Sequence, residues 1–145
     1  MAFLRSSALS DRPAAYVIFR LSLGINILIH GAGRIFGTGA AAFASKTTGL
    51  FAATALPHGL TYAFLAALPY AELILGTMIT AGLFTTWALI LGGLLINVLI
   101  FGTALRADWA IVGIQMIYAM TYYLLLLNVS DNRFSLDSLI LRRHT

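Results

Sequence analysis

The chain carries a row of polar side chains inside an apolar stretch near its N-terminus. In LSLGINILIHGAGRIFG, residues 21–37, the polar residues Ser22, Asn26, His30 and Arg34 follow one another at steps of four. On a helix this spacing places them on one side. A carboxamide, an imidazole and a guanidinium in one stripe predict a polar site that partners on other helices complete.

A carboxylate in a second apolar stretch is the natural partner. Glu72 lies in LTYAFLAALPYAELILGTMITAGL and shares a helical face with Gly76 and Thr80, small residues that let another helix approach closely. An ionisable residue at such a position marks a functional site. We therefore predict Glu72 and His30 as the catalytic, proton-exchanging pair. The alternative is a structural ion pair of Glu72 with Arg34 or Arg106.

The composition places these stretches in lipid. Of the 145 residues, 60% are hydrophobic and 10% are charged, and the mean hydropathy is +0.91. A soluble domain carries about 25% charged residues, because its surface must face water. The sequence therefore predicts an integral membrane protein whose first partner is the lipid bilayer.

Four segments are long and apolar enough to cross a bilayer, which takes roughly 20 helical residues. They cover about residues 14–33, 60–83, 87–105 and 109–127, with Pro13 placed in the opening turn of the first. The links between the second, third and fourth are short, so these neighbours must pack antiparallel. We predict an all-α fold, a membrane four-helix bundle that forms one domain over residues 1–145.

The remaining segments predict two short helices. Residues 35–57 are broken by glycine and too short to span, so we expect a short helix lying along the outer interface between spans one and two. Residues 130–145, SDNRFSLDSLILRRHT, predict a brief amphipathic cytoplasmic helix.

Basic residues near the span ends favour both termini in the cytoplasm. The side of the termini carries Arg5, Arg12, Arg133, Arg142 and Arg143, and the other side carries Arg34, Lys46 and Arg106. Trp87 and Trp109 then mark opposite interfaces. Arg20, roughly 10 Å from the cytoplasmic face at about 1.5 Å per residue, is expected to snorkel toward water.

Each span brings polar groups to a similar depth, roughly 5–15 Å below the outer face at about 1.5 Å per residue. This level predicts an inward-facing pocket in the outer half of the bundle. The predicted ligand-binding residues are Arg34, Asn26, Gln115, Tyr118, Tyr122, Asn97 and Arg106. The alternative is that these amides and phenols only join helices, at about 0.6 kcal/mol each.

Several kinds of site are excluded by composition. The chain has no cysteine, which excludes thiolate metal sites, iron–sulfur clusters and covalently attached haem. A b-type haem would need His30 and His58 as ligands on facing helices, whereas His58 follows Pro57 and is expected to cap a helix. One histidine and one glutamate are too few for a metal site. The chain has no basic run interleaved with aromatic residues, so the sequence does not predict nucleic-acid binding.

The order and spacing of several motifs resemble those of the DoxX family of small bacterial membrane proteins over about residues 14–137. The matching positions are Arg20 and Gly24, His30, Gly31 and Arg34, Pro57, Glu72, Gly82 and Leu83, with RFSLD at the end. Two positions depart from the family pattern: Arg34 stands where lysine is common, and Thr85 and Thr86 stand where a basic residue commonly ends the second span. The resemblance implies a four-helix bundle in the bacterial inner membrane. It also implies respiratory quinone chemistry, because relatives include subunits of quinol oxidase and of thiosulfate:quinone oxidoreductase.

The first functional hypothesis is a quinone- or quinol-interacting subunit of a membrane oxidoreductase, acting with other membrane subunits. Quinone is then the one non-covalent cofactor expected. His30, Asn26 and Gln115 would donate hydrogen bonds to the ring carbonyls, and Glu72 would take a quinol proton while Arg34 steadies its charge. The aromatic residues expected to flank the ring are Tyr118, Tyr122 and Phe101.

Two alternatives belong to other classes. One is a structural or assembly subunit whose polar layer only fixes helix register. The other is a small transporter in which Arg34, Arg106 and His30 attract an anion such as thiosulfate. No inverted repeat or pair of broken helices favours transport.

Overall fold

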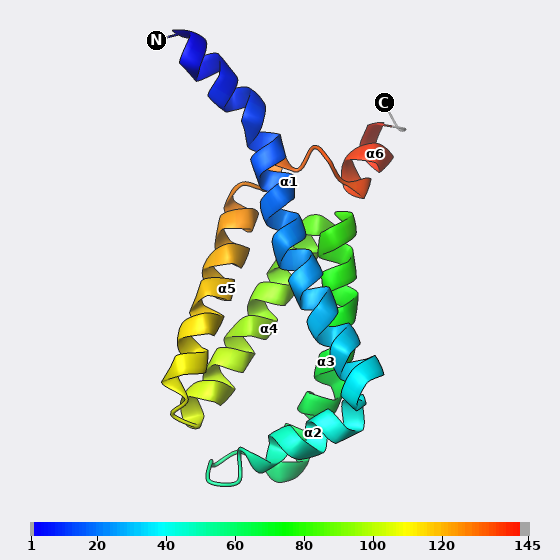
Figure 1. Cartoon of the computed structure of the whole chain (residues 1–145), viewed down its shortest axis with the longest axis vertical. Coiled ribbons are helices and arrows are strands. Elements are labelled where there is room, and N and C mark those ends of the chain that lie inside the picture. The colour runs from blue at the N-terminus through cyan, green and yellow to red at the C-terminus, as the bar shows by residue number, and fades with distance from the viewer. Residues whose placement is uncertain (1, 143–145) are drawn as a thin grey trace.

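The fold is all-α, as the sequence predicts. A computed structural model describes residues 2–142 and, among these, the side chains of residues 11–140. Within residues 2–142 there are six α-helices and no strand (Figure 1). They are α1 (Ala2–Ala32), α2 (Ala40–Gly49), α3 (His58–Ala81), α4 (Thr85–Leu105), α5 (Trp109–Leu127) and α6 (Leu136–Arg142). A π-helical segment, η1 (Gly33–Thr38), follows α1, and a 3-10 turn, η2 (Val129–Asp131), follows α5.

Four stretches of the described chain are long and apolar enough to cross a membrane: residues 11–38, α3, α4 and α5. Together they form a four-helix membrane bundle. The second, third and fourth stretches begin and end within two residues of the predicted bounds. The first differs, because α1 begins at Ala2 and Pro13 lies inside the helix rather than in its opening turn. A proline removes a single backbone donor, and here the helix continues on both sides of it.

Consecutive long helices run antiparallel, so the beginning of α1 and α6 lie at one end of the bundle and α2 lies at the other (Figure 1). The short helices predicted between the first two spans and in the C-terminal tail are both present, as α2 and α6. Trp87 and Trp109 are exposed at the starts of α4 and α5, at opposite ends of the bundle. A cytoplasmic location for the termini stays a prediction. Three of the arginines used for it, Arg5, Arg142 and Arg143, have side chains outside the described set.

Helices α1 and α3 pack so closely that their backbones touch at glycines. A Cβ atom added to Gly31 would lie 2.6 Å from the carbonyl oxygen of Pro69, and one added to Gly76 would overlap the backbone of Leu28. Small residues allow this approach, and van der Waals packing rather than hydrophobic burial then holds the helices together in lipid. These contacts fix the register between α1 and α3.

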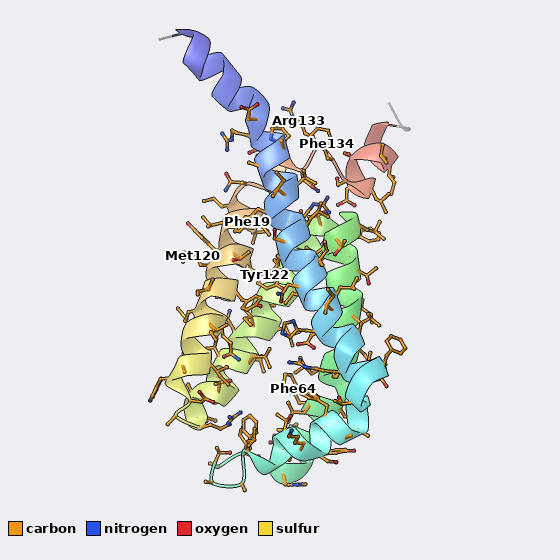
Figure 2. The ribbon with its side chains drawn as sticks, in the orientation of Figure 1. Phe19, Phe64, Met120, Tyr122, Arg133 and Phe134 are labelled. Atoms are coloured by element: carbon orange, nitrogen blue, oxygen red, sulfur yellow. The ribbon has the colours of Figure 1, made fainter. Side chains whose placement is uncertain are left out.

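Helices α4 and α5 form the second close pair. The ring of Tyr122, only 5% exposed, packs against Gly92, where a Cβ atom would lie 2.6 Å from the phenol oxygen. Figure 2 shows Tyr122 turned into the bundle and Met120 on the outer side of α5. Ile79 and Leu125 complete the core between these helices and α3. Much of α5 is left uncovered, and its buried residues are Tyr122 and Leu125.

Arg20 does not snorkel; its side chain is buried, with 2% of the residue exposed. Its Nη1 donates to the carbonyl oxygens of Ile79 (2.5 Å) and Thr80 (2.9 Å), and its Nη2 donates to that of Phe134 (2.8 Å). The end of α3 leaves carbonyls without helical partners, and its dipole is negative there, so a cation is stabilised at this point. The expectation of snorkelling was wrong, because the guanidinium finds its acceptors among backbone carbonyls inside the bundle.

Asp137 joins α6 to the turn between α3 and α4. Its carboxylate accepts hydrogen bonds from the backbone N–H groups of Phe84 (2.7 Å) and Thr85 (2.8 Å) and from the Thr85 hydroxyl (2.7 Å). It therefore caps the N-terminus of α4 from a distant part of the chain, where an anion is favourable. The bundle end near the termini is closed by Arg20 and Asp137 together.

Candidate functional site

The site is built around an ion pair between α1's π-helical extension and α3. Nη1 of Arg34 donates to both carboxylate oxygens of Glu72, at 2.5 Å each. Glu72 is 5% exposed, whereas the side chain of Arg34 keeps 27% of its surface exposed. The register set by Gly31 and Gly76 brings these two side chains together. Glu72 is therefore paired with Arg34, as the structural alternative for this residue predicts.

Arg34 is held in place from a second side by α2. Its Cζ atom lies 4.5 Å from the centroid of the Phe43 ring, a cation–π contact. Arg34 lies in η1, where the wider π-helical turn changes the direction in which successive side chains point. The short helix between the first two spans therefore does more than cover the bundle, because it fixes the arginine against Glu72.

The guanidinium of Arg34 borders a cavity of about 510 Å³ at the α2 end of the bundle. Its walls come from α2, the loop after α2, α3, α4 and α5. The aromatic residues of the wall are Phe43, Phe51, Phe64 and Phe101, and the polar ones are Arg34, Thr47, Thr61, Thr103, Arg106 and Gln115. A mostly apolar cavity of this size with a few polar groups is typical of a small-molecule site.

Arg106 stands at another part of the same wall and is also paired. Its Nη2 lies 3.2 Å from a carboxylate oxygen of Asp108, and its Cζ lies 5.1 Å from the centroid of the Phe51 ring. Each arginine of the cavity is thus matched by one carboxylate and one aromatic ring. The charges at the cavity wall sum to zero when both carboxylates are ionised.

Gln115 supplies a neutral polar group to the wall. Its Nε2 donates to the Thr103 hydroxyl at 3.1 Å, joining α5 to α4. Its Oε1 is buried and has no hydrogen-bond partner among the described residues. A buried polar atom without a partner is uncommon, and in a cavity wall it is available to a ligand.

Asn26, His30 and Tyr118 form a separate polar group between α1 and α5. The Tyr118 hydroxyl donates to Oδ1 of Asn26 at 2.8 Å, and Nδ1 of His30 lies 2.9 Å from the Asn26 carbonyl oxygen. None of the three lines the cavity. His30 bonds to its own helix, and Glu72 is bound by Arg34 instead.

The prediction of one inward-facing stripe on the first helix needs correction. Ser22, Asn26 and His30 are exposed, and only Arg34 turns toward Glu72. The buried face of α1 is the one that carries Arg20 and the glycines packed on α3. The π-helical turn at Arg34 then interrupts the α-helical period on which the stripe was based.

Asn97 and Tyr122 also lie away from the cavity. Asn97 is exposed on the outer side of α4, and its predicted depth, similar to that of the other polar residues, stays a prediction. Depth depends on sequence position alone, whereas the direction of a side chain depends on which face of the helix is buried. Tyr122 is enclosed against Gly92. Of the predicted ligand-binding residues, the structure brings Arg34, Arg106 and Gln115 to the cavity.

The described residues contain no group of three or more His, Cys, Asp and Glu side chains placed to hold a metal ion. His58 is the first residue of α3 and is exposed at its end.

The fold and site define a class: a multi-pass helical membrane protein with a cavity between its spans and a buried arginine–glutamate pair beside it. No protein-family model, no curated protein and no solved structure matches the chain.

Proposed function

We propose that the chain binds a quinone or quinol in the cavity and serves as a subunit of an oxidoreductase of the bacterial inner membrane, together with other membrane subunits. The resemblance to the DoxX family supports the same class. The observation that carries the proposal is an apolar cavity whose two arginines are both neutralised by carboxylates.

The charge balance of the cavity favours a neutral ligand. An anion such as thiosulfate would be attracted by uncompensated cations, but Arg34 faces Glu72 and Arg106 faces Asp108. Binding an anion here would add a third negative group close to both pairs, in surroundings that screen charge poorly. A quinone is uncharged, so it leaves both pairs intact. The paired arginines therefore favour quinone binding over anion transport.

The wall of the cavity suits an amphiphile with a flat polar head. Phe51, Phe64 and Phe101 offer aromatic faces on which a ring can stack. Arg34 uses only Nη1 for Glu72 and keeps other N–H groups for an acceptor such as a ring carbonyl. The unpartnered Oε1 of Gln115 is an acceptor for a quinol hydroxyl.

These positions give the predicted residues different roles. Arg34 and Gln115 line the cavity and would touch the ligand, whereas Glu72 does not line it and acts as the positioning residue for Arg34. His30, Asn26 and Tyr118 lie outside the wall, and we assign them no contact with the ring.

Photolabelling of the purified protein in quinone-free lipid nanodiscs tests the proposal. A photoreactive azidoquinone with a short isoprenoid chain is expected to label peptides of α3 and α4, and decylubiquinone should compete. Leu60→Trp places a bulky ring at the cavity wall, from a residue that is 65% exposed. We expect labelling to fall about tenfold, because overfilling a site costs about 1–3 kcal/mol and 1.4 kcal/mol is a factor of ten.

Ile74→Trp is the matched control. Ile74 lies on the same helix, is 59% exposed and does not line the cavity, so its replacement should leave labelling unchanged. Labelling that is equal in both variants, or that decylubiquinone does not displace, would refute quinone binding at this site. A structural subunit without a quinone site would show one of these two outcomes.

A further inference from the structure

Asn97 is an exposed polar side chain in a membrane span that has no partner among the described residues. It is exposed on α4, and its carboxamide forms no hydrogen bond within the described residues. Short exposed polar side chains of the spans do find partners: the Ser22 and Thr77 hydroxyls donate to carbonyls of their own helices. Asn26 is satisfied by Tyr118. Asn97 differs from these three residues, because no partner is within hydrogen-bond distance of its carboxamide among the described residues.

The depth of Asn97 makes this unusual. Asn97 lies eight positions before Leu105, where α4 ends, which corresponds to about 12 Å at 1.5 Å per residue. A carboxamide on a single methylene cannot reach the interface over that distance, as a lysine or arginine can. Hydrocarbon offers neither donors nor acceptors. The missing partner must come from another polypeptide that packs on this face of α4.

The residues around Asn97 have the spacing of a helix–helix seam. Ile90, Leu94, Asn97, Phe101 and Ala104 follow one another at steps of four and three. This spacing keeps the residues on the side of a helix that faces a second helix in a left-handed crossing. A single asparagine at such an interface fixes the register and the oligomeric state. Leu94 and Phe101, on either side of Asn97, are 57% and 60% exposed.

We propose that two copies of this chain associate in the membrane through this seam of α4, with the two Asn97 carboxamides hydrogen-bonded to each other. A carboxamide carries both a donor and an acceptor, so it is complementary to itself. All copies of the protein insert with the same orientation, and a two-fold axis along the membrane normal brings the same residue of each copy together. The second copy thus supplies the group that Asn97 lacks. The inference rests on Asn97 and not on a ligand in the cavity, and of the seam residues only Phe101 also lines that cavity.

Cysteine crosslinking maps the interface directly, because the native chain has no cysteine. Single variants Ile90→Cys and Leu94→Cys, at seam positions outside the cavity wall, should form disulfide-linked dimers under mild oxidation in membranes. Ile29→Cys is the matched control, since Ile29 is 60% exposed in the first span and lies outside the seam. Crosslinking of the control as efficiently as of the two α4 variants would overturn the proposal.

The contribution of the carboxamide is measured by the dimer dissociation constant in nanodiscs or detergent, with fluorescently labelled protein. Asn97→Leu should raise it about 3- to 30-fold, the range for interhelical hydrogen bonds in membranes. Asn97→Gln keeps the carboxamide and should retain most of the affinity, and Ser22→Ala should leave it unchanged. A wild-type protein that is monomeric at every protein-to-lipid ratio, or an Asn97→Leu variant with wild-type affinity, would refute the inference. Binding of Asn97 only to another protein of the membrane would refute it as well.

Discussion

The ion pair of Arg34 and Glu72 should show strong thermodynamic coupling. Replacing Arg34 with Met leaves the Glu72 carboxylate, which is 5% exposed, without its cation. Removing one partner of a buried pair destabilises a protein by about 3–5 kcal/mol, because the remaining charge is uncompensated. We expect Arg34→Met to fall within this range.

Replacing Glu72 instead of Arg34 should lower the free energy of unfolding by a smaller amount. Glu72→Met removes the buried charge, and Arg34 keeps its contact with Phe43 and a partly exposed guanidinium. The loss is then mainly that of charge-assisted hydrogen bonds, about 1.5–3 kcal/mol. The double variant has apolar side chains of similar size at both positions and should lie within about 1 kcal/mol of the native protein.

The assay is reversible unfolding in mixed micelles with increasing SDS, followed by far-UV circular dichroism, for the native chain, both single variants and the double variant. Arg12→Met is the control. Arg12 also pairs with a carboxylate, that of Asp131 at 3.0 Å, but its side chain is 51% exposed, so its loss should cost at most about 1 kcal/mol. Additive single effects in the double variant, or an Arg34→Met variant no less stable than Arg12→Met, would contradict the argument for a buried, coupled pair.

Two further predictions concern packing. Arg20→Met removes three hydrogen bonds to carbonyls and should lower the free energy of unfolding by at least about 3 kcal/mol. Amide hydrogen exchange around Phe134 should become faster, and unchanged exchange there would contradict the hydrogen bond from Arg20 to the Phe134 carbonyl. Gly76→Ala places a methyl group against the backbone of α1 and should cost about 1–3 kcal/mol in the SDS assay. Gly113→Ala is the control: Gly113 lies on α5 with open space around it, and alanine is the better helix former, so stability should rise by up to about 1 kcal/mol. Equal losses of stability in the two alanine variants would contradict the close packing of α1 on α3.

The composition and the lengths of the apolar segments were enough to predict the spans and the all-α bundle. They sufficed because a bilayer imposes one length and one backbone solution, so each apolar run has few alternatives. The same reasoning did not place the start of α1, since a helix that leaves the membrane is no longer bounded by hydrocarbon.

The candidate site was predicted only in part. Charge and burial pointed to Glu72 and to Arg34 as one of its partners, but depth alone could not show which way Asn97 or His30 faces. The direction of His30 depends on the glycine contacts between α1 and α3, and that of Asn97 on the packing of α4 against α5 at Gly92. The π-helical turn of η1 then separates the direction of Arg34 from that of His30. The cavity forms because α2 packs across one end of the bundle (Figure 1). This is a tertiary arrangement that leaves no local pattern in the sequence.

The cap that Asp137 places on α4 also constrains the order of events during synthesis. Thr85 and Asp137 are 52 residues apart in the chain, so α4 leaves the ribosome long before the carboxylate that satisfies its first backbone amides. The turn between α3 and α4 must remain hydrated, or held by the insertion machinery, until α5 has crossed the bilayer and the chain has returned to the same side. Completion of the bundle is thereby tied to a late step of translation, and a chain interrupted after α5 would carry all its spans while lacking the contact that closes them.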